Sequence, residues 1–402
     1  MKLVFSNQPF PTEVEKTIFL AGPSPRYHTG DKIDVNTWRH EAVAILDSLG
    51  YDGHVFIPLP ASGFVAGIAG KNMVDYLSQI EWERKGLERA DVIFFYVDRK
   101  ADNQGLTTNI EFGEYFDSGR MVYSRPKDAV KVRYMDETII ARDDEFYLNM
   151  TDGLKEVLDR VKTPVHRLDG ETHVPALIFS SPQFQEWYAN LKHAGNRLDG
   201  FIPKSVLAFN KDRFLFGFNA WVNIYITKED RHKSNEWIFS RTATSYVVAY
   251  YDGAEDGKRR FILTREFRSP ASNLEGYVYE MAGGSAVDKK VSPIENAIKE
   301  LEEETGITIH DERRFRHLGT RQTFATYLTM GLFAVAVELT QEEFDEASKR
   351  ALESTILGEN EEERITLHIA TEEELVQNKY PVDWTTLGMI NVLNYFTRNK
   401  TE

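Results

Sequence analysis

Runs of apolar residues alternate with amphipathic segments along the first 130 residues of the chain. The apolar runs have the length of strands and lie at 17–21, 54–58 and 91–97, and segments with helical periodicity lie at 36–49, 74–89 and 110–118. Strands that are apolar throughout are typical of a parallel sheet that helices cover on both faces. We therefore predict a doubly wound α/β domain over residues 1–134.

From about residue 200 the pattern changes to a succession of strand-like runs. These runs lie at 215–226, 244–251, 261–265 and 277–281 before one amphipathic helix, and at 315–321, 328–339 and 365–369 after it, and a last helix spans about 385–397. This order predicts a second α/β domain with a mixed sheet over residues 200–402. Residues 135–199 are mixed and charged, with helical stretches at 152–161 and 183–191, and we interpret them as a helical connector.

Composition narrows the possible functions. A length of 402 residues is too great for one ordinary hydrophobic core, which agrees with two domains. A formal charge of −15 argues against a general binder of nucleic acid or of anionic membranes. The absence of cysteine excludes disulfides, thiolate catalysis and zinc held by sulfur, and it suits a reducing compartment. Because the longest strongly apolar run has only the length of a strand, we expect a cytoplasmic protein that binds no membrane.

The helix in the middle of the second domain carries three glutamates on one face. Glu300, Glu303 and Glu304 are spaced i, i+3 and i+4, and like charges at that spacing repel in a bare helix. A divalent cation would remove this repulsion and would hold a diphosphate through its oxygens. Residues 292–295 form a capping box with proline at the first helical position, and Gly306 stands where a C-cap belongs. The simpler interpretation of such a charge run is a solvated acidic helix face.

Residues 299–307 resemble the core of the Nudix box, whose pattern is Arg-Glu-aliphatic-any-Glu-Glu-any-Gly-aliphatic. The segments 261–270, 277–284 and 358–369 are similar to the ADP-ribose pyrophosphatase branch of that family. The resemblance implies an α/β/α sandwich that hydrolyses the diphosphate of an ADP-ribose-like compound with Mg²⁺ or Mn²⁺. It implies that Glu300, Glu303 and Glu304 hold the metal with Glu280 as a possible ligand, that Glu361 or Glu363 is the base, and that Arg265, Arg268 and Gly284 bind the substrate.

Two positions depart from the Nudix pattern. Val291 stands where the family has the first glutamate of its box, and Lys299 stands where it has arginine. Lysine keeps the charge but lacks the planar guanidinium that orients a neighbouring carboxylate. Asp288, in the loop before the helix, is a candidate substitute ligand. Catalysis and nucleotide binding without turnover are therefore alternative hypotheses for this domain.

A second group of motifs lies in the first domain. The strand at 17–21 ends in Gly22 and Pro23, and backbone N–H groups exposed at such a strand end can receive a phosphate or sugar. Together with the segments 79–83, 88–95 and 107–115, this strand resembles the nucleoside 2-deoxyribosyltransferase family and its deoxynucleotide N-glycosidase relatives. The resemblance implies a flavodoxin-like sheet and a nucleophilic carboxylate at Glu111, with acidic partners at Glu83 and Asp91.

The residues themselves allow a structural interpretation of the same carboxylates. Glu111 would then be a carboxylate that the dipole at a helix N-terminus stabilises, and Asp91 would be a cap at the start of a strand.

The combined motifs predict a two-domain enzyme whose substrate is a small nucleotide. One domain would split a diphosphate, and the other would cleave or transfer at an N-glycosidic bond. The alternatives are a nucleotide sensor with a degenerate Nudix site, and an N-glycosidase whose Nudix domain is a scaffold. Because both families commonly build sites across a dimer interface, we expect a homodimer.

Overall fold

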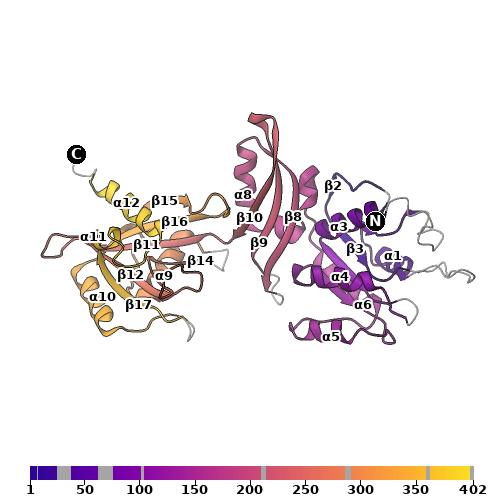
Figure 1. The fold of residues 1–402 in the computed structure, drawn as a ribbon, viewed down its shortest axis with the longest axis horizontal. Helices are drawn as coiled ribbons and strands as arrows, with labels where there is room; N and C mark the ends of the chain where they lie inside the picture. The colour runs from indigo at the N-terminus through magenta and orange to yellow at the C-terminus, as the bar shows by residue number, and fades with distance from the viewer. Residues whose placement is uncertain are drawn as a thin grey trace, which may run out of the picture. The chain divides into compact units, whose positions relative to one another are not determined.

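The computed structural model describes residues 1–6, 8–24, 38–61, 76–100, 104–209, 214–285, 291–358 and 363–398. The chain divides into two compact units, Met1–Arg241 and Thr242–Glu402, and both are α/β (Figure 1). The division follows Arg241, whereas the sequence pattern places it at residue 200. The boundary lies after Arg241 because a three-stranded sheet beyond residue 196 still belongs to the first unit.

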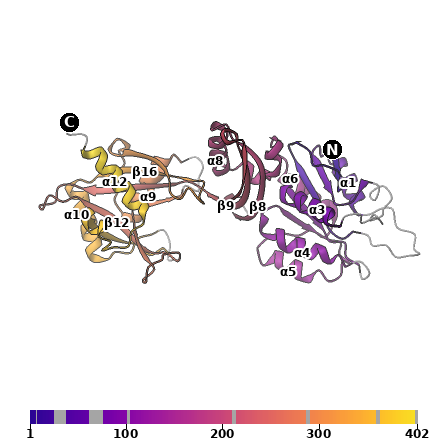
Figure 2. The same ribbon diagram turned by 45° about the horizontal axis from the view of Figure 1, so that its top comes forward.

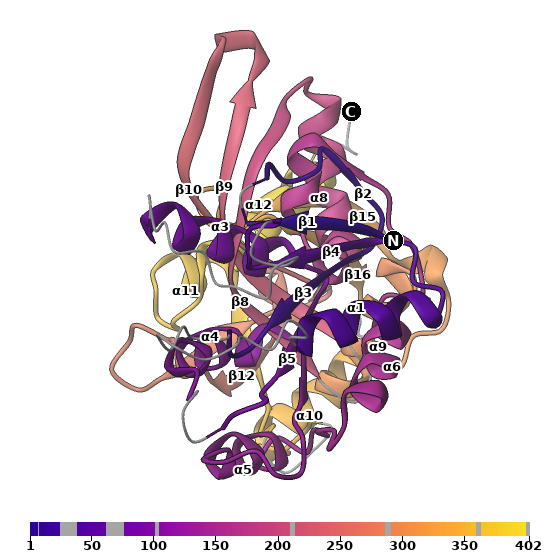
Figure 3. The same cartoon turned by 90° about the vertical axis from the view of Figure 1, so that its right-hand side faces the viewer.

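The first unit is built on a parallel sheet of five strands in the order β1-β4-β3-β5-β6. Its strands are β1 (Lys2–Phe5), β4 (His54–Ile57), β3 (Thr17–Ala21), β5 (Val92–Tyr96) and β6 (Met121–Ser124). Helices α1 (Trp38–Ser48) and α6 (Met150–Arg160) pack on one face, and α3 (Tyr76–Arg89), α4 (Leu106–Tyr115) and α5 (Arg133–Ile140) pack on the other (Figure 3). This arrangement confirms the predicted doubly wound sheet and explains why its central strands are apolar throughout.

The strand order places a topological switch between β3 and β5. From β3 the chain passes through α1 to β4 on one side of β3, and then through α3 to β5 on the other side. In open α/β sheets, ligands bind in the crevice outside the carboxyl ends of the strands at such a point. We therefore expect a ligand-binding site at the residues that follow β3 and β5.

A three-stranded antiparallel sheet completes the first unit. Its strands β8 (Arg197–Phe209), β9 (Phe214–Ile226) and β10 (Arg231–Arg241) are ordered β10-β9-β8. Helix α8 (Pro182–His193) lies beside this sheet (Figure 2), and it shares the core of the sheet with α7 (Ala176–Phe179). In that core, Phe184 lies against Phe201 and Phe218. Residues 135–199 are thus more than a connector, because α6 covers the parallel sheet and α8 covers this one. The strands at 197–241 pack on helices that precede them, so the first unit ends after β10.

The second unit has a mixed sheet of seven strands. Five follow the order β13-β12-β11-β16-β15, β14 pairs with β11, and β17 pairs with β12. The strands are β11 (Thr244–Tyr251), β12 (Arg260–Phe267), β13 (Tyr277–Glu280), β14 (Ala282–Ser285), β15 (Arg316–Gln322), β16 (Gly331–Glu338) and β17 (Thr366–Thr371). Helices α9 (Pro293–Thr305) and α10 (Gln341–Glu353) pack on one face, and α11 (Glu372–Val376) and α12 (Trp384–Arg398) pack on the other. The predicted mixed-sheet α/β architecture is confirmed.

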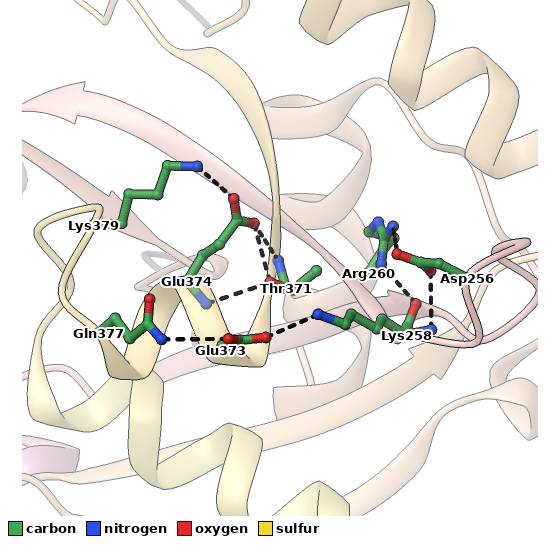
Figure 4. A network of polar contacts seen from close by, with 8 residues as sticks. All are labelled: Asp256, Lys258, Arg260, Thr371, Glu373, Glu374, Gln377 and Lys379. Atoms are coloured by element: carbon green, nitrogen blue, oxygen red, sulfur yellow. Dashed lines mark hydrogen bonds and ion pairs between the residues drawn. The ribbon is translucent and has the colours of Figure 1, made fainter.

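Short elements and polar contacts complete the two units. Strands β2 (Glu13–Val14) and β7 (Arg167–Leu168) pair, and 3₁₀ turns lie at Phe116–Ser118, Asp169–His173, Thr227–Glu229 and Glu312–Arg314. In the second unit, Lys258 Nζ lies 2.8 Å from Glu373 Oε2, which ties the loop before β12 to α11 (Figure 4). Thr371 and Glu374 cap that helix reciprocally. No helix within the described ranges is both long and apolar enough to cross a membrane.

Candidate active sites

Gly22 shapes the turn that leaves β3 at the switch point. Its φ is +148°, and a Cβ atom there would lie 2.2 Å from the carbonyl oxygen of Tyr96 and 2.9 Å from Cζ2 of Trp38. Only glycine lets β3 leave the sheet this close to the end of β5. Trp38 Nε1 donates to the carbonyl oxygen of Pro23 at 2.9 Å and so fixes the next residue of the turn. The turn predicted at Gly22 and Pro23 is therefore held by side chains of α1.

Arg39, which the sequence analysis did not single out, binds the same turn from within the protein. Its side chain is 1% exposed, and it donates from Nε to the carbonyl oxygen of Leu20 at 3.1 Å and from Nη2 to that of Gly22 at 2.8 Å. Burial lowers the pKa of Arg39 to about 10, and the charges of Glu83 and Glu111 act in the opposite direction. Arg39 is therefore a buried cation that holds the turn by hydrogen bonds and interacts electrostatically with two carboxyl groups.

Glu83 on α3 and Glu111 on α4 form a half-buried carboxyl pair near this cation. Burial first, and then the charge of Glu83, raises the pKa of Glu111 to about 8. Burial also raises the pKa of Glu83, whose Oε1 accepts a 2.6 Å hydrogen bond from Gln79 Nε2. Two neighbouring, poorly solvated carboxyls do not both ionise readily, so near neutral pH the pair holds an acid and a carboxylate together.

The position of Glu111 in its helix bears on its alternative interpretation. Helix α4 begins at Leu106, has no acidic residue in its first turn and has no side-chain cap. The helix dipole acts mainly within the first turn, so it does not account for a carboxyl at position 111. Burial beside Glu83 and Arg39 is the dominant feature of this residue.

Asp91 does not join the pair, which corrects the assignment of a catalytic role to it. It directly precedes β5, at the amino end of the parallel sheet, whereas Gly22 and the end of β5 lie at the carboxyl end. Its carboxylate accepts two 2.7 Å hydrogen bonds from Arg167, one from the N–H of Ala176 at 2.7 Å and one from the N–H of Thr17 at 2.9 Å. A 6% exposed carboxylate with these partners joins β3, β5 and β7 and is not available to a substrate.

In the second unit, α9 presents its glutamates to the strand that precedes it. The helix begins with the expected capping box, in which Ser292 N donates to Glu295 Oε2 at 2.7 Å, and it ends at Gly306 with φ +68°. Ala297 and Leu301 are fully buried against the sheet. The caps and this apolar stripe set the rotation of the helix about its axis.

Glu300 and Glu304 lie against the glycines of β14. Gly283 N donates to Glu304 Oε2 at 2.9 Å, and a Cβ atom on Gly284 would lie 2.4 Å from Glu300 Oε1. Glycine at 284 therefore makes room for a carboxylate. Burial raises the pKa of Glu304 to about 8, and the charges of Glu300 and Glu266 add to this rise. Glu303 instead pairs with Lys299, whose Nζ lies 2.8 Å from its Oε1.

Arg268 gathers further carboxylates at this site. Its Nη2 lies 2.9 Å from Glu280 Oε2 and 3.0 Å from Glu266 Oε2. Burial raises the pKa of Glu266, which also responds to the charges of Glu280 and Glu363. Glu266 was not among the predicted site residues, although it lies between the two predicted arginines in the sequence. Arg265 does not contact these carboxylates in the same way, because its guanidinium stacks 3.7 Å from the ring centroid of Tyr277. Glu361 and Asp288 lie outside the described residues.

The fit of these carboxylates to a divalent cation is incomplete in the part of the chain that the structure describes. No group of three or more His, Asp or Glu side chains there is arranged to hold a metal ion. The donors Glu300 and Glu304 do suit Mg²⁺ chemically, because it prefers carboxylate oxygens and would displace the proton that burial holds on Glu304. Two of the predicted ligands therefore fit a metal, while Glu303 and Glu280 are engaged by Lys299 and Arg268.

Comparison with known proteins bears mainly on the first unit. Residues 15–129 match the family model described as nucleoside 2-deoxyribosyltransferase like. Among solved structures, a chain described as an ADP compounds hydrolase is similar, with 14% identity over 51% of this chain and 95% of that chain and a TM-score of 0.35. No curated protein matches the sequence.

Proposed function

We propose that the first unit cleaves or transfers at the N-glycosidic bond of a deoxynucleoside or deoxynucleotide. The observation that carries this proposal is the half-buried pair of Glu83 and Glu111 near the switch point of the sheet, within the electrostatic reach of the buried Arg39. The match of residues 15–129 to a nucleoside 2-deoxyribosyltransferase-like model supports the same chemistry.

The reaction needs one carboxylate and one carboxylic acid. In the reacting form of this coupled pair, Glu83 carries the one remaining proton and Glu111 is ionised. The ionised Glu111 carboxylate forms a bond to the anomeric carbon while the bond from that carbon to the base nitrogen breaks. The electron pair stays on the base, which takes a proton from Glu83. A water molecule or a second base then attacks the glycosyl ester, and Glu83 recovers the proton. Arg39 does not react, and it positions the turn at Gly22 and stabilises the ionised member of the pair.

Substitution of Glu111 tests this proposal. We expect Glu111→Gln to lower the release of free base from a panel of deoxynucleosides and deoxynucleotides by about a hundredfold or more, because it removes the nucleophile. Glu114→Gln, an exposed carboxylate on the same helix, is the matched control and should retain activity. In the wild type, kcat/KM should fall as pH rises through about 8, because the pair then loses its one remaining proton and Glu83 can no longer protonate the base. Release of base that is equal in wild type and Glu111→Gln would exclude the mechanism.

We further propose that the second unit hydrolyses the diphosphate of an ADP-ribose-like compound with Mg²⁺ or Mn²⁺. The observation that favours it is the half-buried pair of Glu300 and Glu304 at the glycines of β14, on a helix with the Nudix pattern. A bound metal would activate water and neutralise phosphate charge. Glu300 and Glu304 would hold it, Arg268 would attract the diphosphate, and Glu363 is the proposed base.

Hydrolysis of ADP-ribose to AMP and ribose 5-phosphate measures this second activity. With Mg²⁺ present, we expect turnover by the wild type and a loss of about a hundredfold in Glu304→Gln, because a neutral amide is a poor metal ligand. Glu302→Gln, an exposed position on the same helix, should behave as wild type. Thermal stabilisation by ADP-ribose without its consumption would instead select a nucleotide sensor, as Val291 and Lys299 favour.

A further inference from the structure

The first unit contains a cavity that is not lined by Glu83 or Glu111. It has a volume of about 310 Å³ and lies between the end of α3, the 3₁₀ turn at Asp169–His173 and the three-stranded sheet. Its walls include Lys85, Arg89, His173, Phe201, Ile202 and Trp221. This volume is at the lower end of the range for small-molecule sites.

Arg89 supplies a cation with free donors. Its Nε donates to the carbonyl oxygen of Lys85 at 2.9 Å, and its guanidinium lies 4.1 Å from the ring centroid of Phe10. Phe10 in turn stacks on Trp82 at 4.9 Å, so the guanidinium rests on a fixed aromatic surface. Its two terminal nitrogens make no hydrogen bond to any residue that the structure describes. The dipole of α3 explains a cation in its last turn but leaves these donors unused.

The charges around Arg89 leave the cavity receptive to an anion. Burial lowers the pKa of Arg89 to about 10, which shows that a charge there is poorly solvated. Glu88 also lines the cavity; burial raises its pKa, and the charges of Lys204, Arg84 and Arg89 act in the opposite direction. Lys85 adds a second cation, and its carboxylate partner Glu81 is 3.9 Å away on the exposed side of the helix. The cavity wall therefore carries two cations, Arg89 and Lys85, and one carboxyl group, Glu88.

His173 is a neutral polar group in the same wall. Burial first, and then the charges of Arg89 and Lys85, lowers its pKa to about 4, while Asp199 acts in the opposite direction. The imidazole makes no hydrogen bond within the described ranges. An anion placed between Arg89 and His173 would accept hydrogen bonds from both and would favour protonation of the imidazole.

The sheet provides an apolar wall and an opening. Ile202 is 37% exposed and Trp221 is 41% exposed, and both line the cavity. The register of β8 shifts between Leu198 and Gly200, and that of β10 shifts between Lys233 and Glu236, so both strands have irregularities at the cavity. β-bulges of this kind often re-aim side chains next to functional sites. A ligand that consists only of a charged group would make no contact with the apolar surfaces of Ile202 and Trp221.

We propose that this cavity binds a small organic anion with a ring-sized apolar body and one carboxylate or phosphate group. The anionic group lies between Arg89, Lys85 and His173, and the apolar body packs on Ile202 and Trp221. The binding site is independent of the glycosidic chemistry proposed for Glu83 and Glu111.

Titration calorimetry of the full chain with four probes tests the proposal. Benzoate and phenyl phosphate carry both parts of the ligand and distinguish carboxylate from phosphate, whereas benzyl alcohol lacks the charge and inorganic phosphate lacks the ring. We expect at least one aryl anion to bind, and both single-feature probes to bind about tenfold more weakly or not at all. Absence of binding by both aryl anions, or equal binding by benzyl alcohol, would overturn the proposal.

Variants locate the bound probe. Arg89→Met should weaken aryl-anion binding about tenfold or more, and Arg84→Met, a cation on the exposed side of the same helix, should change it less than about twofold. Lys85→Met, at a half-exposed side chain, repeats the test if Arg89→Met unfolds the protein. Binding should strengthen as pH falls from about 7 to about 5, because His173 takes up a proton and Glu88 begins to lose its charge, and His173→Gln should reduce this dependence. Unchanged affinity in both Arg89→Met and Lys85→Met would place the ligand elsewhere.

Discussion

Two half-buried carboxyl groups, Glu111 and Glu304, have pKa values raised to about 8. Burial is the largest cause at both, and each has a second glutamate close by, Glu83 for Glu111 and Glu300 for Glu304. A side chain kept protonated in this way destabilises the fold when it ionises, so a structural role does not explain it. Strongly shifted groups of this kind are concentrated at functional sites.

Glu304 should make stability depend on pH. Because its folded-state pKa is raised above 4.5, the folded state binds more protons than the unfolded state, and the free energy of unfolding should fall as pH rises from about 4.5 to about 8. The slope for one such group is at most about 1.4 kcal/mol per pH unit. We expect Glu304→Gln to reduce this fall in urea unfolding without divalent metal, while Glu302→Gln leaves it unchanged. An identical pH dependence in wild type and Glu304→Gln would contradict the raised pKa.

The residues that the sequence could not place are those whose role depends on distant partners. The motif pointed to Glu83 and Glu111, and the structure brings both beside Arg39. Arg39 itself has no local signal, since it contacts Leu20 and Gly22 only once α1 packs on the sheet. Asp91 lies in the same motif, but its partner Arg167 is 76 positions away in the chain. Sequence spacing therefore could not separate its structural role from a catalytic one.

At the scale of elements, the ion pair of Asp91 and Arg167 links β5 to the segment that leads into α7. Both side chains are almost fully buried, and the N–H of Ala176 donates to the same carboxylate. Loss of one member of a buried pair leaves the other charge without compensation, which is more costly than the pair is stabilising.

Asp91→Asn should therefore destabilise the first unit by about 3 kcal/mol or more. The amide would face the donors of Arg167 and Ala176 without a charge to balance the guanidinium. Asp52→Asn, which breaks the exposed pair with Lys16, should cost well under about 1 kcal/mol. Urea unfolding followed by circular dichroism compares the two variants, and equal midpoints would show that the Asp91 pair contributes no more than a surface contact.

Periodicity predicted most strands but not all of them. The run at 244–251 coincides with β11, because a strand buried on both faces is apolar throughout. β16 begins at Gly331 instead of residue 328, and β8 and β10 were not predicted. The first half of β10 is polar and largely exposed, so it has no apolar pattern and owes its place to pairing with β9. Such pairing is a long-range property that no local window contains.

At the scale of the whole molecule, two α/β units were predictable, but the boundary between them was not. Near residue 200 the sequence pattern changes from alternating strands and helices to successive strands. This change marks the first antiparallel strand and not the start of the second unit. β8, β9 and β10 share a core with α7 and α8, to which Ile178 and Phe184 of these helices and the preceding Val174 contribute. The local sequence pattern indicates whether a segment is a helix or a strand. Only the packing of its side chains shows to which folded unit the segment belongs.

The buried pair of Asp91 and Arg167 also limits how this protein could be assembled from parts. The segment similar to a known family ends at residue 129, before Arg167. A gene fragment cut at that limit would encode Asp91 without its cation and the parallel sheet without α6. A fragment that keeps the packing of the first unit intact therefore spans residues 1–241 and includes the antiparallel sheet. The folded unit is longer than the segment that matches the family model.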